Sequence, residues 1–303
     1  MPDLGIDRSL LVYSGLNSTA VLQDYSGQLR QHPEINANAY TKDVATALGG
    51  FTSIPNAVGL SALLISIVIE LAFAFRRSEP SEDAAGLLRR VFAEEKSSAV
   101  RDLLHEYVNR YGMYLHDEKR MLEETQRLEH QLSAQLTRLR NSMLLDGHVS
   151  SRALKQWVNG AAFHAQMVIH IARLGEGDSA PPRAVITRYR TEAKKLLSRY
   201  KEYKAPKFWV QYSAGLSCQK SARRKRLFGA YTMACTMCDS ELGTAVFLTE
   251  PHRPEECNNG LVEAYLDHMF SVSDQIPGME KYFSELDINL DELIAQHGTF
   301  HVI

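Results

Sequence analysis

The sequence lacks the common catalytic signatures. It contains no HExxH, no GxSxG, no Walker phosphate loop and no GxGxxG dinucleotide loop. No nucleophile stands near a base in a recognisable pattern, and carboxylate pairs such as Glu123 and Glu124 are adjacent, so they diverge on a helix. His164 and His170 are six residues apart and do not share a helical face well. We therefore expect a protein that is not an enzyme and that needs no cofactor.

Cysteine is scarce, with four in 303 residues, which does not suggest a disulfide scaffold. The spacing C-x16-C-x2-C-x18-C is a weak match to a zinc ribbon, although two thiolates two residues apart can reach one tetrahedral ion. Cys235 and Cys238 also lie one helical turn apart if the segment is helical. We favour core packing of these small side chains over metal binding. The weak candidate ligands are Cys218, Cys235, Cys238 and Cys257.

Targeting signals are also lacking. The first residues have neither a basic region nor a sustained apolar region, which does not fit a cleaved secretory signal. Pro2 rules out the N-myristoylation pattern, and residues 299–303 carry no prenylation cysteine. The default expectation is an intracellular protein.

What stands out is an apolar run, 57–75, with the sequence AVGLSALLISIVIELAFAF and a single charge, Glu70. A helix of this length just spans about 30 Å of hydrocarbon. An ionised Glu70 near the bilayer centre costs about 2.5–3.5 kcal/mol, and less nearer one end. Three alternatives remain open, namely a constitutive membrane span, a buried helix that can emerge into a membrane, and a permanently buried core helix.

If the run enters a bilayer, its large apolar side chains contact lipid and a basic pair flanks it. The flanking pair, Arg76 and Arg77, would keep that end of the helix in the cytosol. The candidate lipid-contacting residues are Leu60, Leu64, Ile65, Ile67, Val68, Ile69, Leu71, Phe73 and Phe75.

Helical periodicity dominates the rest of the chain. Apolar residues recur at steps of three, four or seven through 84–145, which predicts one long helix or two nearly collinear ones. After Gly147, a natural helix end, an apolar helix over 151–174 folds back as an antiparallel hairpin with the first. A basic helix follows from Pro182 to about Tyr203. Two short segments, 208–210 and 245–248, fit strands or continued helix equally, and further helices are expected at 259–274 and 279–296.

These elements predict a mainly α fold, an elongated antiparallel helical bundle with a central apolar helix. We divide it into a weakly ordered segment (1–45), a bundle (46–204) that contains the run 57–75 and the hairpin 84–174, and a smaller, mostly helical region (205–303) packed on the basic helix.

Charge is distributed in two blocks of opposite sign. Residues 178–226 carry 14 Lys and Arg against 3 Asp and Glu, whereas 227–303 carry 2 against 13. Such blocks most simply fold against each other. The four-residue basic cluster, Arg223, Arg224, Lys225 and Arg226, is a candidate site for an anionic partner, although a solvated turn that complements the acidic block is the simpler interpretation.

Three functions follow from these observations. The leading hypothesis is a non-enzymatic, membrane-associated helical protein of the pore-forming or membrane-remodelling type, with lipid as its partner. The alternative is an intracellular helical scaffold, cytoplasmic and soluble, with 57–75 as its core and a protein partner or a second copy bound to it. The third, and least favoured, is a nucleic-acid binder that uses 183–226.

Overall fold

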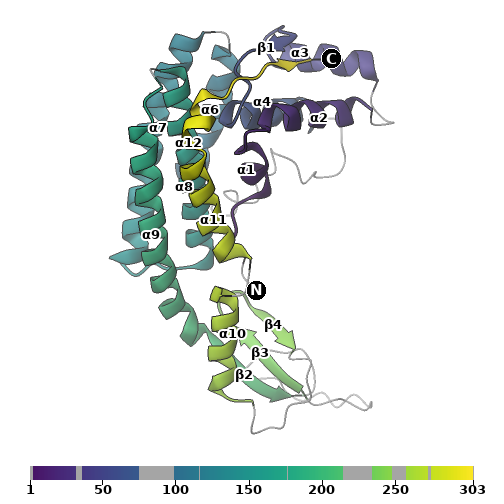
Figure 1. Cartoon of the computed structure of the whole chain (residues 1–303). Coiled ribbons are helices and arrows are strands. Elements are labelled where there is room, and N and C mark those ends of the chain that lie inside the picture. The colour runs from purple at the N-terminus through teal and green to yellow at the C-terminus, as the bar shows by residue number, and fades with distance from the viewer. Residues whose placement is uncertain are drawn as a thin grey trace.

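The fold is mainly helical, as predicted, and it also contains a small antiparallel sheet. The structure is a computed structural model, and Figure 1 shows the arrangement of its elements. It describes residues 3–31, 36–74, 99–115, 117–175, 177–213, 234–247, 257–271 and 274–302.

Four helices form the central layer. They are α6 (Ala99–Tyr114), α7 (Glu118–Leu144), α8 (Ser151–Leu174) and α9 (Ala180–Lys204), and α7, α8 and α9 stand side by side in Figure 1. The sequence predicted α8 and α9 within a few residues. Ser150 caps the start of α8, because its hydroxyl accepts the N–H of Ala153. Nearly all of its residues are buried, which makes it the centre of the layer.

The expectation of one long helix, or two collinear ones, over 84–145 is wrong. Helices α6 and α7 fold back on each other after Tyr114 and before Glu118, which brings Tyr107 beside Thr125 and Arg110 beside Glu124. No glycine or proline marks this turn. Its local signal is Asp117, whose carboxylate accepts the N–H of Arg120 and caps α7. Residues 84–98 lie outside the described part of the chain.

The N-terminal residues also differ from the weakly ordered segment that we expected. They form helices α1 (Arg8–Tyr13), α2 (Ser18–Arg30) and α3 (Ala37–Ala47), all of which pack on helix α4 (Leu60–Ala74). Before α4, strand β1 (Ser53–Ile54) pairs antiparallel with β5 (Phe300–His301). Helix α4 itself begins five residues after Pro55.

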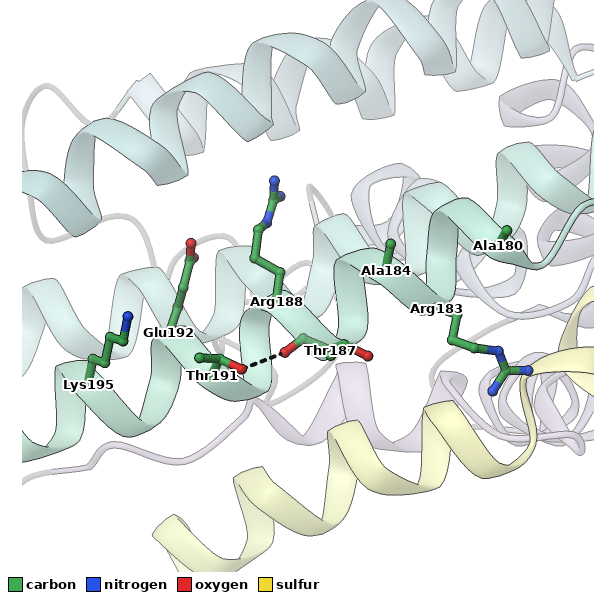
Figure 2. Close-up of a pocket in the computed structure, with 8 residues that line it drawn as sticks. All are labelled: Ala180, Arg183, Ala184, Thr187, Arg188, Thr191, Glu192 and Lys195. Carbon is green, nitrogen blue, oxygen red and sulfur yellow. Dashed lines mark hydrogen bonds between the residues drawn. The ribbon is translucent and has the colours of Figure 1, made fainter.

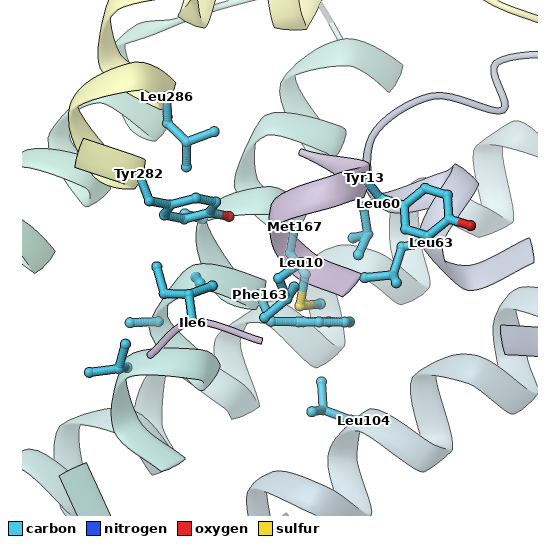
Figure 3. Close-up of a cluster of buried hydrophobic side chains, with 14 of the residues drawn as sticks. Ile6, Leu10, Tyr13, Leu60, Leu63, Leu104, Phe163, Met167, Tyr282 and Leu286 are labelled. Carbon is cyan, nitrogen blue, oxygen red and sulfur yellow. The ribbon is translucent and has the colours of Figure 1, made fainter. Parts of the chain in front are cut away.

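The core joins segments from both ends of the chain. Figure 3 shows side chains of α1, α4, α6 and α8 converging with Tyr282 and Leu286 of α11 (Gln275–Ile288). The backbones approach closely in places, because at Gly160 of α8 an added Cβ would lie 2.6 Å from Leu136 Cδ2 of α7. Helix α12 (Leu290–Ala295) also packs on α8. We call all these helices, with β1 and β5, the helical body.

The remaining elements form a small C-terminal lobe, which lies at the bottom of Figure 1, at the end of α9. After the 3-10 turn Ala205–Lys207, strands β2 (Phe208–Ser213), β3 (Ala234–Asp239) and β4 (Thr244–Phe247) form a sheet in that order. Helix α10 (Asn259–Ser271) packs on β2. The segments near 208 and 245 are therefore strands, and the lobe is less helical than we expected for 205–303.

The two charge blocks fold against each other, as predicted. Arg183 Nη1 lies 3.0 Å from Asp287 Oδ1, and Lys201 Nζ lies 2.8 Å from Asp267 Oδ1. Arg190 also reaches Asp287, at 3.5 Å. Acidic side chains of α10 and α11 thus neutralise part of the basic surface of α9.

Candidate functional site

Helix α4 is the feature on which the sequence interpretation rests, and the structure places it inside the helical body. It packs on α1, α2, α3, α6 and α8. Five of the candidate lipid-contacting residues are at most 1% exposed: Leu60, Leu64, Ile65, Ile67 and Ile69. Val68 is half-buried, and Leu71 is 39% exposed. Most of the described apolar surface of α4 is therefore covered by protein.

The polar groups of α4 are covered as well. Ser61 is hydrogen-bonded to the hydroxyl of Tyr111 on α6, and the Ser66 hydroxyl donates to the carbonyl of Leu63 at 2.7 Å. Glu70 is buried. These residues are accommodated in a protein interior without lipid around them.

No helix in the described part of the chain is both long enough and apolar enough to cross a membrane. The side chain of Phe73 and the residues Phe75, Arg76 and Arg77 lie outside that part.

A pocket of about 460 Å³ opens where the start of α4 meets α6, α7 and α8. Its lining residues are Pro55, Asn56, Ser61, Tyr111, Leu115, Asp117, Glu118, Met121, His170 and Leu174. We call it the His170 pocket. A volume of this size fits a small organic molecule.

His170 is buried beside a cation. Its Nδ1 lies 3.4 Å from Arg173 Nη1. Burial, and then the charge of Arg173, lower the pKa of His170 to about 3, so the ring is neutral near pH 7. Burial lowers the pKa of Arg173 to about 10. Two carbonyls hold this guanidinium, those of Val58 and Leu293.

His164 is also buried, in a different environment. Its Nε2 lies 2.7 Å from Glu129 Oε1 of α7, and its Nδ1 lies 3.0 Å from the hydroxyl of Tyr189 on α9. Burial acts to raise the pKa of Glu129, but the hydrogen bond and the charge of His164 bring it below the usual value. This cluster joins three helices and borders neither of the pockets described here.

A second hollow, of about 700 Å³, runs along α9 between Ala180 and Lys195 (Figure 2). Arg183, Arg188 and Lys195 line it together with Glu192. Arg183 is bound to Asp287, and Glu192 to Arg140 of α7. Because part of its charge is neutralised in this way, the groove has fewer cations available for phosphate than the sequence suggested.

The cysteines differ from expectation. Cys235 and Cys238 lie on strand β3, not on a helix, and Cys235 forms a disulfide with Cys257 at the start of α10. Cys238 is also disulfide-bonded. Cys218 lies outside the described residues, and among those described no group of His, Cys, Asp and Glu side chains could hold a metal ion. Cys235 and Cys238 are buried, as core packing requires, but they are disulfide-bonded strand residues and neither free thiols on a helix nor zinc ligands.

The same lobe is tied to the helical body by a buried lysine. Lys204, at the end of α9, is completely buried and lies 2.7 Å from Asp239 Oδ2 and 2.5 Å from Glu241 Oε2. Ser151, at the start of α8, donates its N–H to Glu241. Burial acts to raise the pKa of Glu241, but the hydrogen bonds of Lys204 and Ser151 lower it below the usual value.

The basic cluster, Arg223, Arg224, Lys225 and Arg226, lies outside the described residues, so the structure does not place it. We did not predict the His170 pocket from the sequence. Its only sequence signal was a histidine on a helix that is apolar around most of its surface.

No protein-family model matches this chain, and neither does any curated protein or any solved structure.

Proposed function

We propose that the protein is a non-enzymatic helical scaffold that works by binding and that uses α4 as its permanent core. The observation that supports this proposal is the enclosure of α4, whose residues Leu60 to Ile69 are almost entirely covered by helices from distant parts of the chain. Burial of a large aliphatic side chain contributes about 1.5–3 kcal/mol. Removing α4 from this position would therefore cost far more than the marginal stability of an ordinary domain.

A pair of substitutions on α4 tests the proposal. Ile65→Asp places a carboxylate at a fully buried position, and we expect it to unfold the protein, at a cost above about 4 kcal/mol. Leu71→Asp, at a 39% exposed position of the same helix, should cost about 1 kcal/mol or less. Urea denaturation followed by circular dichroism measures both. An Ile65→Asp protein that stays folded but no longer binds vesicles would overturn the scaffold proposal.

Conditional membrane insertion is the second candidate, and the surroundings of α4 offer one observation in its favour. His170 and Arg173 lie beside the residues that open α4, so protonation of His170 would place two positive charges together there. Flotation with vesicles of phosphatidylcholine and phosphatidylserine, at pH 7.4 and pH 5, separates the two candidates. A permanent core predicts no flotation at either pH, and acid-triggered insertion predicts flotation at pH 5 alone.

Nucleic-acid binding through 183–226 is the weakest candidate. Arg183, Arg190 and Lys201 already contact acidic side chains. Binding to a short DNA or RNA duplex should be strongest at low salt if phosphate contacts exist. We expect no binding at 50 mM salt.

The Cys235–Cys257 disulfide is informative about the cellular compartment of the protein. Disulfides persist in oxidising compartments and are rare in the reducing cytosol. As part of this proposal we therefore place the lobe in an oxidising environment, in contrast to the intracellular location expected from the sequence. Thiol labelling of protein isolated without reductant would test this, since a cytosolic chain would label at Cys235 and Cys257.

A further inference from the structure

The His170 pocket contains a buried hydrogen-bond donor that lacks an acceptor. Arg173 carries only donors, so His170 Nδ1 must accept from Arg173 Nη1, at 3.4 Å. The ring proton of the neutral imidazole is then on Nε2. His170 is 2% exposed, and its Nε2 has no hydrogen-bond partner among the described residues. A buried donor of this kind is rare in a folded protein and marks a place where an acceptor belongs.

The mouth of the pocket is acidic. Glu118, in the first turn of α7, accepts a hydrogen bond from Asn56 Nδ2 at 3.1 Å. Among the described residues no cation forms a salt bridge with Glu118, whereas its neighbour Asp117 is bound by Arg120 at 3.4 Å. Within the described residues, the carboxylate of Glu118 therefore carries a negative charge that no salt bridge neutralises. It stands at an exposed position, within reach of a dissolved cation.

Apolar side chains complete the lining. Leu115, Met121 and Leu174 face the pocket along with the hydroxyl pair of Ser61 and Tyr111. The pocket thus combines a negative charge at its mouth, an apolar wall and a buried N–H donor. An anionic ligand would be repelled by Glu118, and the described residues offer no cluster for a metal ion.

We propose that the His170 pocket binds a short organic ammonium compound that also carries an acceptor oxygen. Its ammonium group pairs with Glu118, its methylene groups pack on the apolar wall, and its oxygen accepts from His170 Nε2–H. This inference rests on the proposed function, because Ser61 of α4 belongs to the pocket and is present only while α4 stays in the core.

Binding of simple amines tests the proposal. The probe is 2-aminoethanol, and the matched compounds are ethylamine, which lacks the oxygen, and ethanol, which lacks the charge. Ligand-observed NMR titration at pH 7.5 should show 2-aminoethanol binding at least tenfold more tightly than either. The same titration with vesicles that display phosphatidylethanolamine shows whether a free amine or a lipid headgroup is preferred, and we expect the free amine.

Substitutions assign the two contacts. Glu118→Gln retains the oxygen that accepts from Asn56 but removes the charge, and should weaken binding at least tenfold. Glu123→Gln, at an exposed position of the same helix outside the pocket, should leave binding unchanged. His170→Phe should abolish the preference for 2-aminoethanol over ethylamine. His170→Gln, which offers both an acceptor to Arg173 and an N–H donor, should retain it.

The proposal fails if 2-aminoethanol does not bind, if the vesicles bind and the free amine does not, or if Glu118→Gln and His170→Phe bind it as the unaltered protein does. If none of the probes binds, the pocket holds water alone. Such a result would leave the scaffold proposal standing, because that proposal is decided by the Ile65→Asp and Leu71→Asp pair. A different outcome separates the two proposals the other way. If the protein floats with vesicles at pH 5, the scaffold proposal fails. If 2-aminoethanol still binds at pH 7.5, the proposed amine site is nevertheless supported.

Discussion

The helical body and the C-terminal lobe are stabilised in different ways. The body buries long apolar helices around α4 and α8, and its core draws on segments from both ends of the chain. The lobe has three short strands and one helix, and its ties are the Cys235–Cys257 disulfide and the buried ion cluster around Lys204. Small units bury a smaller fraction of their surface and commonly need covalent or ionic ties. Substitutions at the ties of the lobe should therefore destabilise the lobe and the start of α8 that contacts it, and leave the rest of the helical body folded.

The largest loss of stability is expected for Lys204→Met, at the junction of the lobe and the helical body. It leaves Asp239 and Glu241 without their buried cation, and we expect the loss of about 4 kcal/mol of unfolding free energy. Hydrogen exchange should show the loss of protection in β3 and at the start of α8. Lys201→Met, which breaks an exposed pair with Asp267, should cost less than about 1 kcal/mol. Equal costs for the two variants would contradict the buried role of Lys204.

The second largest effect is expected for the double variant Cys235→Ala with Cys257→Ala. The disulfide joins residues 22 apart. Its removal should cost about 3 kcal/mol, because the unfolded lobe gains chain entropy. Limited proteolysis should cut the lobe first and leave α7 and α8 intact. Cleavage of the lobe and of the helical body at the same rate would show that the two regions fold as one unit.

Lowering the pH should destabilise the helical body, because unfolding allows His170 to take up a proton. Its pKa is about 3 in the folded protein and about 6.5 when unfolded, so the unfolded chain binds more protons between these values. Stability is therefore complete above pH 6.5 and falls as the pH drops, by about 2 kcal/mol between pH 7 and pH 5. Urea titrations across this range measure the slope. His170→Gln should flatten it, and an unchanged slope would exclude His170 as its cause.

The smallest effect is expected at Gly59, just before α4. Its φ is +55°, and an added Cβ would lie 3.3 Å from Arg173 Nη2, so Gly59→Ala should cost about 1 kcal/mol. Gly112→Ala, in α6 with open space around it, should instead stabilise the protein by about 0.5–1 kcal/mol. Shifts of the unfolding temperature in opposite directions for the two variants would confirm that the backbone at residue 59 requires a glycine.

The sequence predicted the elements whose signals are local. Gly147 separates α7 from α8, Pro182 lies in the first turn of α9, and both α8 and α9 have long apolar stripes. The reversal between α6 and α7 was missed because Asp117 is its local mark, and strands β2 and β4 are too short to show a period. The His170 pocket depends on contacts between Ser61, Tyr111 and His170, which no spacing in a single sequence reveals.

The closure of the chain over the start of α4 has a consequence for synthesis. Residue Ala57 donates its N–H to the carbonyl of Gly298, Val302 donates to that of Thr52, and His297 and Asn56 are in contact although 241 residues separate them. At about 5–20 residues per second, these partners are made roughly 10–50 s after α4 itself. A nascent chain therefore carries an incompletely covered apolar helix during that interval, which is when a chaperone would act on it.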